Sequence, residues 1–301
     1  MTAYVSAAAV FGPSGFTSSE LGPPGLVPDS LLASSLTLRG LRPLSRTARL
    51  AMVAAAAVWP PSPDARDAVV LGSARSSVAP LAEFVQVAAE HGPDQVFPMA
   101  FPNTVVSVHV GYVATLLGIT GPAVAVCGEH AGLEAVVEAL SLLAAGRADR
   151  ALALGADAAE PTVRSGDPHA AEGAAAVRLS ALREPDCLAA VTGSWTAATY
   201  DDLPAEVRPA YPLVADRFGA ASGAARVAVA ALAVSSDGRP RTVVGPSGVR
   251  GVAAVRLEQG SGLSPVLPAR GRRVPRPVTA RWSGVARRDP GPRPGHRPPS
   301  G

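Results

Sequence analysis

Short apolar runs alternate along the chain with longer segments whose apolar residues recur at helical spacing. The short runs predict buried strands at Tyr4–Val10, Ala68–Gly72, Ala123–Val126, Ala151–Gly155 and Ala174–Leu179. The longer segments predict helices at Leu44–Val58, Val78–His91, Asn103–Leu117 and Ala131–Ala145. This alternation favours an α/β fold in which helices cover both faces of a sheet.

Glycine, proline and serine mark the expected ends of these elements. Ser45 is a possible N-cap for the first long helix, and Trp59-Pro60-Pro61 would stop it. Gly92, Gly118 and Gly146 would end the next three helices. The Gly-, Pro- and Ser-rich segment Gly12–Ser35 is expected to be an irregular loop.

The second half of the chain shows a weaker version of the same pattern. We expect a helix at Ala220–Val234 and strands at Thr242–Val244 and Gly251–Leu257. From Gln259 the chain consists mainly of Pro, Gly, Arg and Ser, which predicts a disordered tail. The expected division is therefore 1–180, 181–258 and a tail of 259–301.

Composition excludes several classes of protein. No apolar run reaches the roughly 20 residues that a spanning helix needs, and the start lacks the basic and apolar regions of a secretory signal. The chain has 2 Cys and no Lys, so we expect no disulfide framework, Schiff-base lysine or Walker-type phosphate site. We therefore predict a cytoplasmic protein that does not act on a membrane.

The basic charge is concentrated in the tail. Residues 261–301 contain nine Arg and one acidic residue, a net +8, whereas the whole chain carries +3, so the other 260 residues carry about −5. The tail could attract an acidic partner protein. It lacks interleaved aromatic residues apart from Trp282, so we expect no nucleic-acid partner and favour a solvated extension.

Five segments, taken in order, resemble the β-ketoacyl synthase (thiolase-like) superfamily. Phe101–Pro122 resembles the stretch before the nucleophile elbow of that family, and Gly121–Val136 resembles the elbow itself, a strand followed by a tight turn and a helix. The other three similar segments are Leu41–Leu50, Gly146–Asp157 and Ala171–Leu179. The resemblance implies a thiolase-like layered α/β fold, with helices packed on a mixed sheet and the second half abbreviated.

Within that superfamily the chain is most similar to the chain-length factors of type II polyketide systems. Those carry Glu-Gln-Ala-Gly where this chain has Glu129, His130, Ala131 and Gly132, and His130 takes the place of the nucleophilic cysteine. The resemblance implies a catalytically silent subunit of polyketide or fatty-acid-like biosynthesis that forms a heterodimer with an active ketosynthase. It assigns those four residues to the elbow and the substrate tunnel, and an acyl carrier protein to the partners.

The family's two histidine motifs are not matched. No His-Gly-Thr-Gly-Thr is present, and Asp216 falls where the second histidine would lie. No His occurs between His169 and His296, so no shift of register restores the pair. Since condensation needs a thiolate and two imidazoles or their equivalents, we expect no catalytic residue in this chain.

Other roles for the elbow residues remain open. Cys127 could be a displaced nucleophile, or His130 an acyl acceptor, in a divergent acyltransferase; we favour a buried, inert Cys127 and a packing or hydrogen-bonding His130. A third hypothesis is an acyl-carrier-binding or lipid-binding scaffold. Cys127, His130 and His169 fit no zinc pattern, so we expect no metal.

The partner would cover apolar surface on both sides of the elbow. The candidate contacts come from the helix Asn103–Leu117 and the strand Ala123–Val126, and they are Asn103, His109, Tyr112, Val124 and Val126. We place His109 on the polar side of its helix, at the interface or on the surface. Glu134 and Glu138 would mark a solvated helix face. No dinucleotide fingerprint follows a strand, so we expect no cofactor.

Overall fold

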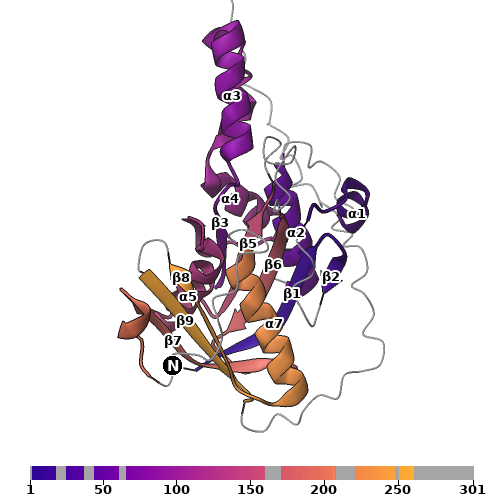
Figure 1. The fold of residues 1–301 in the computed structure, drawn as a ribbon. Coiled ribbons are helices and arrows are strands. Elements are labelled where there is room, and N and C mark those ends of the chain that lie inside the picture. Colours follow the sequence, from indigo (N-terminus) through magenta and orange to yellow (C-terminus); the bar gives the residue numbers. More distant parts are fainter. Residues whose placement is uncertain are drawn as a thin grey trace, which may run out of the picture.

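The computed structural model describes residues 2–17, 25–36, 44–60, 66–159, 171–205, 207, 221–247 and 251–260 (Figure 1). Within them, 9 strands join in one sheet with the order β4-β3-β5-β6-β1-β7-β9-β8, and β2 pairs with β1. The strands are β1 (Ala3–Gly12), β2 (Gly15–Thr17), β3 (Asp67–Ser73), β4 (Ala123–Cys127), β5 (Arg150–Asp157), β6 (Gly173–Ser180), β7 (Ala189–Ala197), β8 (Arg241–Ser247) and β9 (Gly251–Glu258).

The sheet is mixed, as the resemblance implied. Strands β4, β3 and β5 run parallel, with Val70 of β3 opposite Val124 of β4 and Ala153 of β5. Strand β6 is antiparallel to both β5 and β1. All residues of β3 are buried, as expected for a parallel strand covered on both faces.

Helices cover both faces of this sheet. The helices are α1 (Asp29–Ser35), α2 (Arg46–Val58), α3 (Val78–His91), α4 (Val106–Leu117), α5 (Ala131–Ala144) and α7 (Ala221–Asp237). On one face, α2 and α4 pack with Val69 and Leu71 in a single apolar cluster. On the other, α5 and α7 share a cluster with Val70, and β8 and β9 pack on their far side through Val243 and Val255. The predicted layered α/β architecture is confirmed.

Most expected helix ends are confirmed in detail. The Ser45 hydroxyl accepts a hydrogen bond from the Ala48 N–H at 3.2 Å and so caps α2. Gly92, Gly118 and Gly146 follow α3, α4 and α5 with φ of 93°, 70° and 65°. These backbone angles favour glycine over residues with a side chain.

Three expectations about local structure were wrong. The segment Gly12–Ser35 contains β2 and α1 as well as loop. The helix expected from Asn103 begins at Val106, because Pro98–Thr104 form a separate 3-10 helix, η2. Strand β7 was not predicted, because its second half, Thr-Gly-Ser-Trp-Thr-Ala, lacks the apolar run of the other strands.

The predicted domain division at residue 180 falls between β6 and β7. The sheet continues across it, because β7 pairs with Ala3–Val5 of β1. The expectation of a disordered tail concerns residues outside the described part of the chain, apart from Gln259 and Gly260.

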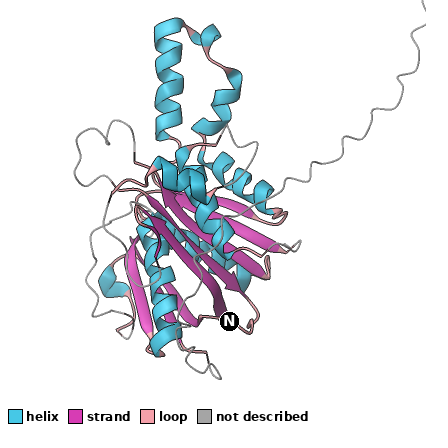
Figure 2. Cartoon of the chain, turned by 90° about the vertical axis from the view of Figure 1, so that its right-hand side faces the viewer, coloured by secondary structure: helices cyan, strands magenta, loops and turns pink. Residues whose placement is uncertain are grey.

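Residues 78–105 form an arm that stands away from the sheet (Figures 1 and 2). It consists of α3, a short 3-10 helix η1 (Pro93–Gln95) and η2. No residue of α3, η1 or η2 is buried, so this arm packs mainly against itself. Among the described residues no single helix could cross a membrane; by length and composition alone η2 with α4 qualifies, as a pair bent by 95°.

Two glycines allow the first turn of α5 to lie close to its neighbours. A Cβ atom on Gly72 of β3 would lie 2.0 Å from the Ala131 carbonyl oxygen, and one on Gly223 of α7 would lie 2.5 Å from the Leu133 nitrogen. Real side chains do not tolerate such distances from backbone atoms. Both positions therefore require glycine for α5 to begin where it does.

We predict that Gly72→Ala destabilises the protein severely, by more than about 3 kcal/mol, because backbone must move to accept the methyl group. Urea unfolding followed by circular dichroism would measure the loss. The matched control is Gly111→Ala in α4, where nothing lies within 4 Å of the added Cβ atom. This substitution should be neutral or stabilising by up to about 1 kcal/mol. Equal unfolding midpoints for the two variants would contradict the packing argument.

Candidate functional site

The predicted strand, turn and helix meet at residues 127–131. Gly128 follows β4 with φ of 141°, and its N–H donates to the Ser73 carbonyl at 3.3 Å. The Ala131 N–H donates to the Gly128 carbonyl at 3.1 Å, which closes the turn. His130 is the N-cap residue of α5. The structure thus places His130 directly before the helix, at the end of the turn.

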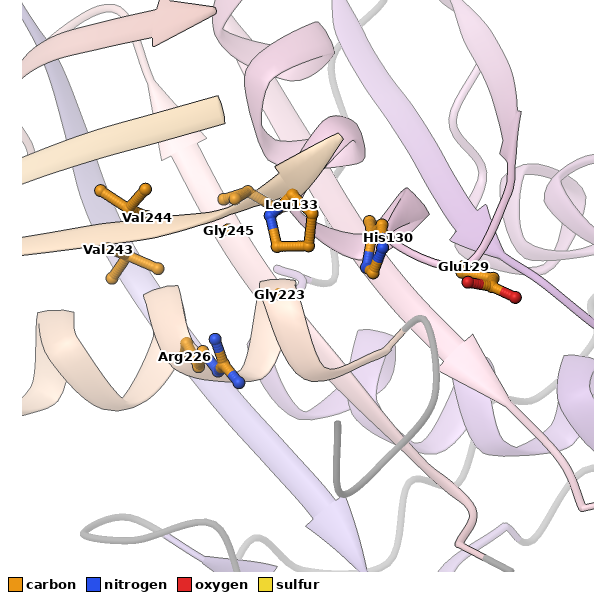
Figure 3. A pocket seen from close by; sticks show the side chains of 9 residues that line it. Glu129, His130, Leu133, Gly223, Arg226, Val243, Val244 and Gly245 are labelled. Atoms are coloured by element: carbon orange, nitrogen blue, oxygen red, sulfur yellow. The ribbon is translucent and has the colours of Figure 1, made fainter. Parts of the chain in front are cut away.

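The elbow is enclosed by α7 and β8 (Figure 3). A cavity of about 20 Å³ lies among the side chains and backbone of Glu129, His130, Leu133, Gly223, Arg226, Val243, Val244, Gly245 and Pro246. That volume holds about one water molecule. The described residues outline only a small cavity at this point. Ala131 and Gly132 are buried, His130 is half-buried and Glu129 is exposed.

Cys127 is exposed, and the expectation of a buried thiol was wrong. It is the last residue of β4, which pairs only with β3 among the described strands. An edge strand has one side uncovered, and for that reason its terminal residue remains accessible. Cys187, by contrast, is a buried free thiol.

Several other candidate residues can be placed only in part. His169 and Asp216 lie outside the described residues. In the part of the chain that the structure describes, no group of three or more His, Cys, Asp and Glu could hold a metal ion. Glu134 and Glu138 are half-buried on α5, so their helix face is only partly solvated.

The candidate interface residues lie along one side of the molecule. Val124 and Val126 are half-buried on the edge strand β4. Asn103 at the end of η2 and Tyr112 on α4 are also half-buried. These four residues keep some exposed surface, as a contact with a partner would require.

His109 does not lie on the surface, and this expectation was wrong. Its side chain is 0% exposed, because it lies one turn before the buried Val113 on the face of α4 that packs against the body. Neither ring nitrogen has a hydrogen-bond partner among the described residues. Burial lowers the pKa of His109, and the nearby Val106 carbonyl offsets this only in part.

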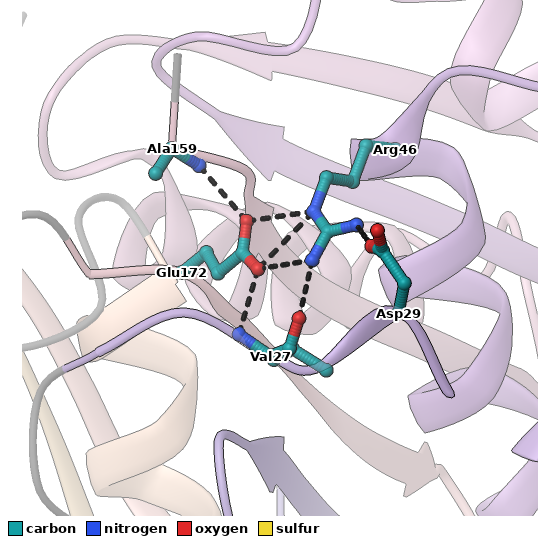
Figure 4. Close-up of polar contacts among 5 residues, drawn as sticks. All are labelled: Val27, Asp29, Arg46, Ala159 and Glu172. Carbon is teal, nitrogen blue, oxygen red and sulfur yellow. Dashed lines mark hydrogen bonds and ion pairs between the residues drawn. The ribbon is translucent and has the colours of Figure 1, made fainter. Parts of the chain in front are cut away.

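A second polar centre surrounds Glu172 (Figure 4). Its carboxylate is completely buried and accepts hydrogen bonds from the Val27 N–H at 2.7 Å and the Ala159 N–H at 3.2 Å. The Arg46 guanidinium donates to both carboxylate oxygens, at 2.9 Å and 2.5 Å, and also pairs with Asp29. Glu172 therefore joins three separate stretches of chain.

A second buried carboxylate, that of Asp157, organises the loop after β3. Asp157, at the end of β5, accepts hydrogen bonds from the Ser73 hydroxyl at 2.6 Å and from the N–H groups of Ala74 and Arg75, both at 3.0 Å. Ser73 also lies opposite Cys127 in the β3–β4 register. The carboxylate thus fixes the strand on which the elbow rests.

The segments that contain Arg46, Asp157 and Glu172 were recognised in the sequence through the family resemblance. The contacts of these residues were not predicted. One sequence pattern could have predicted the buried carboxylate. An isolated acidic residue among small apolar neighbours, as in Ala171-Glu172-Gly173, implies a buried charge that needs a partner. The identity of the partner depends on tertiary contacts between residues 126 positions apart.

We predict that Glu172→Ala destabilises the protein by about 3–5 kcal/mol, because Arg46 and two backbone N–H groups lose their shared partner. The free energy of unfolding in urea would measure this. As a control, Asp149→Ala removes the exposed ion pair with Arg66 and should change stability little. A small effect at both positions would contradict a structural role for the buried pair.

We also predict a pH dependence from His109. Its pKa is below the ordinary value of 6.5 in the folded protein, so the unfolded chain binds the proton first. Stability should therefore fall as the pH drops below 6.5, by at most about 1.4 kcal/mol per pH unit. His109→Leu should remove this part of the slope in urea unfolding measured from pH 7 to pH 5. Parallel profiles for the two proteins would contradict the prediction.

Comparisons with known proteins agree with this geometry. Residues 39–172 match the family model described as the N-terminal domain of β-ketoacyl synthase. The matched region includes the elbow and both acidic contacts at Asp157 and Glu172. Comparison with curated protein sequences gave no match.

Solved structures of ketosynthases share the fold. The ishigamide ketosynthase/chain length factor superimposes with a TM-score of 0.67 at 19% identity, covering 86% of this chain and 100% of that chain. A type II polyketide acyl-carrier protein in complex with its ketosynthase, bound to the hexaketide, gives 0.63 at 14% identity, covering 86% and 99%. A β-ketoacyl synthase from Burkholderia phymatum STM815 gives 0.65 at 12% identity, again covering 86% and 99%. Residues 39–172 of the chain are thus similar to the N-terminal domain of β-ketoacyl synthases, and its described residues have the thiolase-like fold.

Proposed function

We propose that this protein is a catalytically silent, chain-length-factor-like subunit that pairs with an active ketosynthase. It would act in the cytoplasm, in type II polyketide or fatty-acid-like biosynthesis. An acyl carrier protein would be a further partner. The observation that carries the proposal is His130 at the N-cap of α5, where a condensing enzyme needs a thiolate. An imidazole there cannot hold the acyl chain as a thioester.

The closed elbow supports catalytic silence. A condensing site must admit an acyl chain and a malonyl group beside the nucleophile. The cavity that the described residues leave at His130 is about 20 Å³, and Gly223 allows α7 to lie close to Leu133 of α5. The proposal therefore assigns the chain a role in shaping a partner's tunnel.

The surface of the chain supports a stable partner. Strand β4 is an edge of the described sheet and carries no charged residue or proline that would protect it from pairing with another strand. The arm exposes Phe97, Met99 and Phe101 by 69%, 68% and 58%. Soluble proteins rarely leave such a set of large apolar side chains uncovered. Asn103, Tyr112, Val124 and Val126 would be covered together with them.

The exposed thiol of Cys127 supports a second candidate, a divergent acyltransferase. An acyl thioester of a carrier would transfer its acyl group to the Cys127 sulfur, with release of the carrier thiol. The described residues place no second catalytic group against this thiol. We therefore rank this candidate below the silent subunit.

The test is to co-express the chain with the ketosynthase encoded nearest to it and to measure mass by size exclusion with light scattering. We expect a one-to-one complex whose condensation activity is lost when the partner's cysteine is replaced. His130→Ala in this chain should leave condensation within about threefold of wild type, as expected for a group outside the chemical step.

A different result would favour the acyltransferase. Intact-protein mass spectrometry of the chain alone, incubated with an acyl thioester, would then show one added acyl group. That adduct should disappear in Cys127→Ala and persist in Cys187→Ala, since the Cys187 thiol is buried. Acyl loading with this pattern would contradict the silent-subunit proposal.

A further inference from the structure

Helix α3 carries an apolar stripe that nothing in the described structure covers. Val78, Leu81 and Val85 are 49%, 47% and 55% exposed. Together with Ala88 they follow one another at intervals of three, four and three positions along the sequence. We call these four residues the α3 seam. Such alternation of three and four is the pattern with which one helix packs along another at a shallow crossing angle.

The seam is distinct from the face of α3 that holds the arm together. Pro80, Phe84 and Val87 line a cavity of about 330 Å³ between α3 and the η1–η2 segment. The Phe84 ring also contacts Phe101 of η2, with ring centroids 5.8 Å apart. The inner face of α3 therefore already has its neighbour, and the seam is a second apolar face that lacks one.

Small residues beside the seam favour a helix as the occupant. Ala82 and Ala89 are exposed and follow Leu81 and Ala88 directly, so the backbone of another helix could approach closely. Gln86 and Glu90 are exposed on a separate, polar strip of α3, where Gln86 donates to Glu90 at 2.8 Å. An amphipathic helix laid along the seam would cover the apolar residues and leave this polar strip in water.

Charge distinguishes between the possible occupants. Residues 78–105 contain Glu83, Glu90 and Asp94 and no Arg or Lys. A second copy of the arm would bring three further carboxylates close to these, and like charges at an interface oppose association. A helix flanked by Arg or Lys complements the arm in both shape and charge.

We propose that the α3 seam docks a basic amphipathic helix of the partner ketosynthase. The inference rests on the proposed function and adds to it the segment that selects the partner. The helix would carry apolar residues at the same alternating spacing and would lie along Val78, Leu81, Val85 and Ala88. The acidic residues of the arm favour this heteromeric contact over a pair of identical arms.

The test uses the full chain co-expressed with that ketosynthase. Leu81→Glu should weaken the complex about 30-fold or more, the loss typical of a buried contact at the centre of an interface. Val85→Glu should do the same. The matched control Gln86→Glu places the same charge on the polar strip and should change the affinity less than about threefold. All four proteins should keep the same circular dichroism spectrum, since the replaced side chains are exposed.

Photo-crosslinking identifies the occupant. Benzoylphenylalanine at position 82 should crosslink to a ketosynthase helix with flanking Arg or Lys, as mapped by peptide mass spectrometry. Crosslinks only within or between copies of this chain would overturn the proposal.

The outcomes separate this inference from the proposed function. If Leu81→Glu and Gln86→Glu bind the ketosynthase equally well, the seam is not the contact and the inference is overturned, while the subunit proposal stands. If the wild-type chain binds no ketosynthase but dimerises through Leu81, the occupant is a second copy, and both proposals fail. A wild-type chain that stays monomeric when it is co-expressed with the ketosynthase would also overturn both proposals.

Discussion

The close contact between the first turn of α5 and strand β3 is the constraint on which the rest of this structure depends. It exists because position 72 carries no side chain and the Ala131 carbonyl fills the space. Gly223 repeats this arrangement from the other side, where α7 approaches Leu133. Two helix starts are thereby held over the ends of the parallel strands, the place where open α/β sheets commonly form their sites. Here the same closeness leaves almost no cavity.

Two buried carboxylates anchor the loops and strand ends of this scaffold. Glu172 with Arg46 holds the chain near Val27 and Ala159, and Asp157 with Ser73 holds the end of β3 beside the elbow, each by means of a buried carboxylate. Buried charges of this kind are costly unless every group finds a partner. The chain retains these partners although His130 occupies the N-cap of α5. The buried carboxylates and the residue at the N-cap are thus set by separate contacts.

Residues whose role follows from their near neighbours could be predicted from the sequence. The cap at Ser45, the stops at Gly92 and Gly146 and the buried run Val69–Leu71 were all recognised, because backbone geometry and local periodicity decide them. Burial set by distant contacts could not be predicted. His109 was expected at the surface and is buried, and Cys127 was expected inside and is exposed, because α4 packs on the body while β4 lies at an edge. The Arg46–Glu172 pair required the folded chain for the same reason.

The two edges of the described sheet differ in how they are protected. Strand β8 carries Pro246, which removes one backbone donor, and begins with Arg241; strand β4, Ala-Val-Ala-Val-Cys, has neither proline nor charge. Unpaired backbone groups on such an apolar strand favour association with any available strand. Under the proposed function, chains produced in excess of their partner would be the ones lost to aggregation or proteolysis. A short stretch of five residues would in this way match the amount of the subunit to the amount of its partner in the cell.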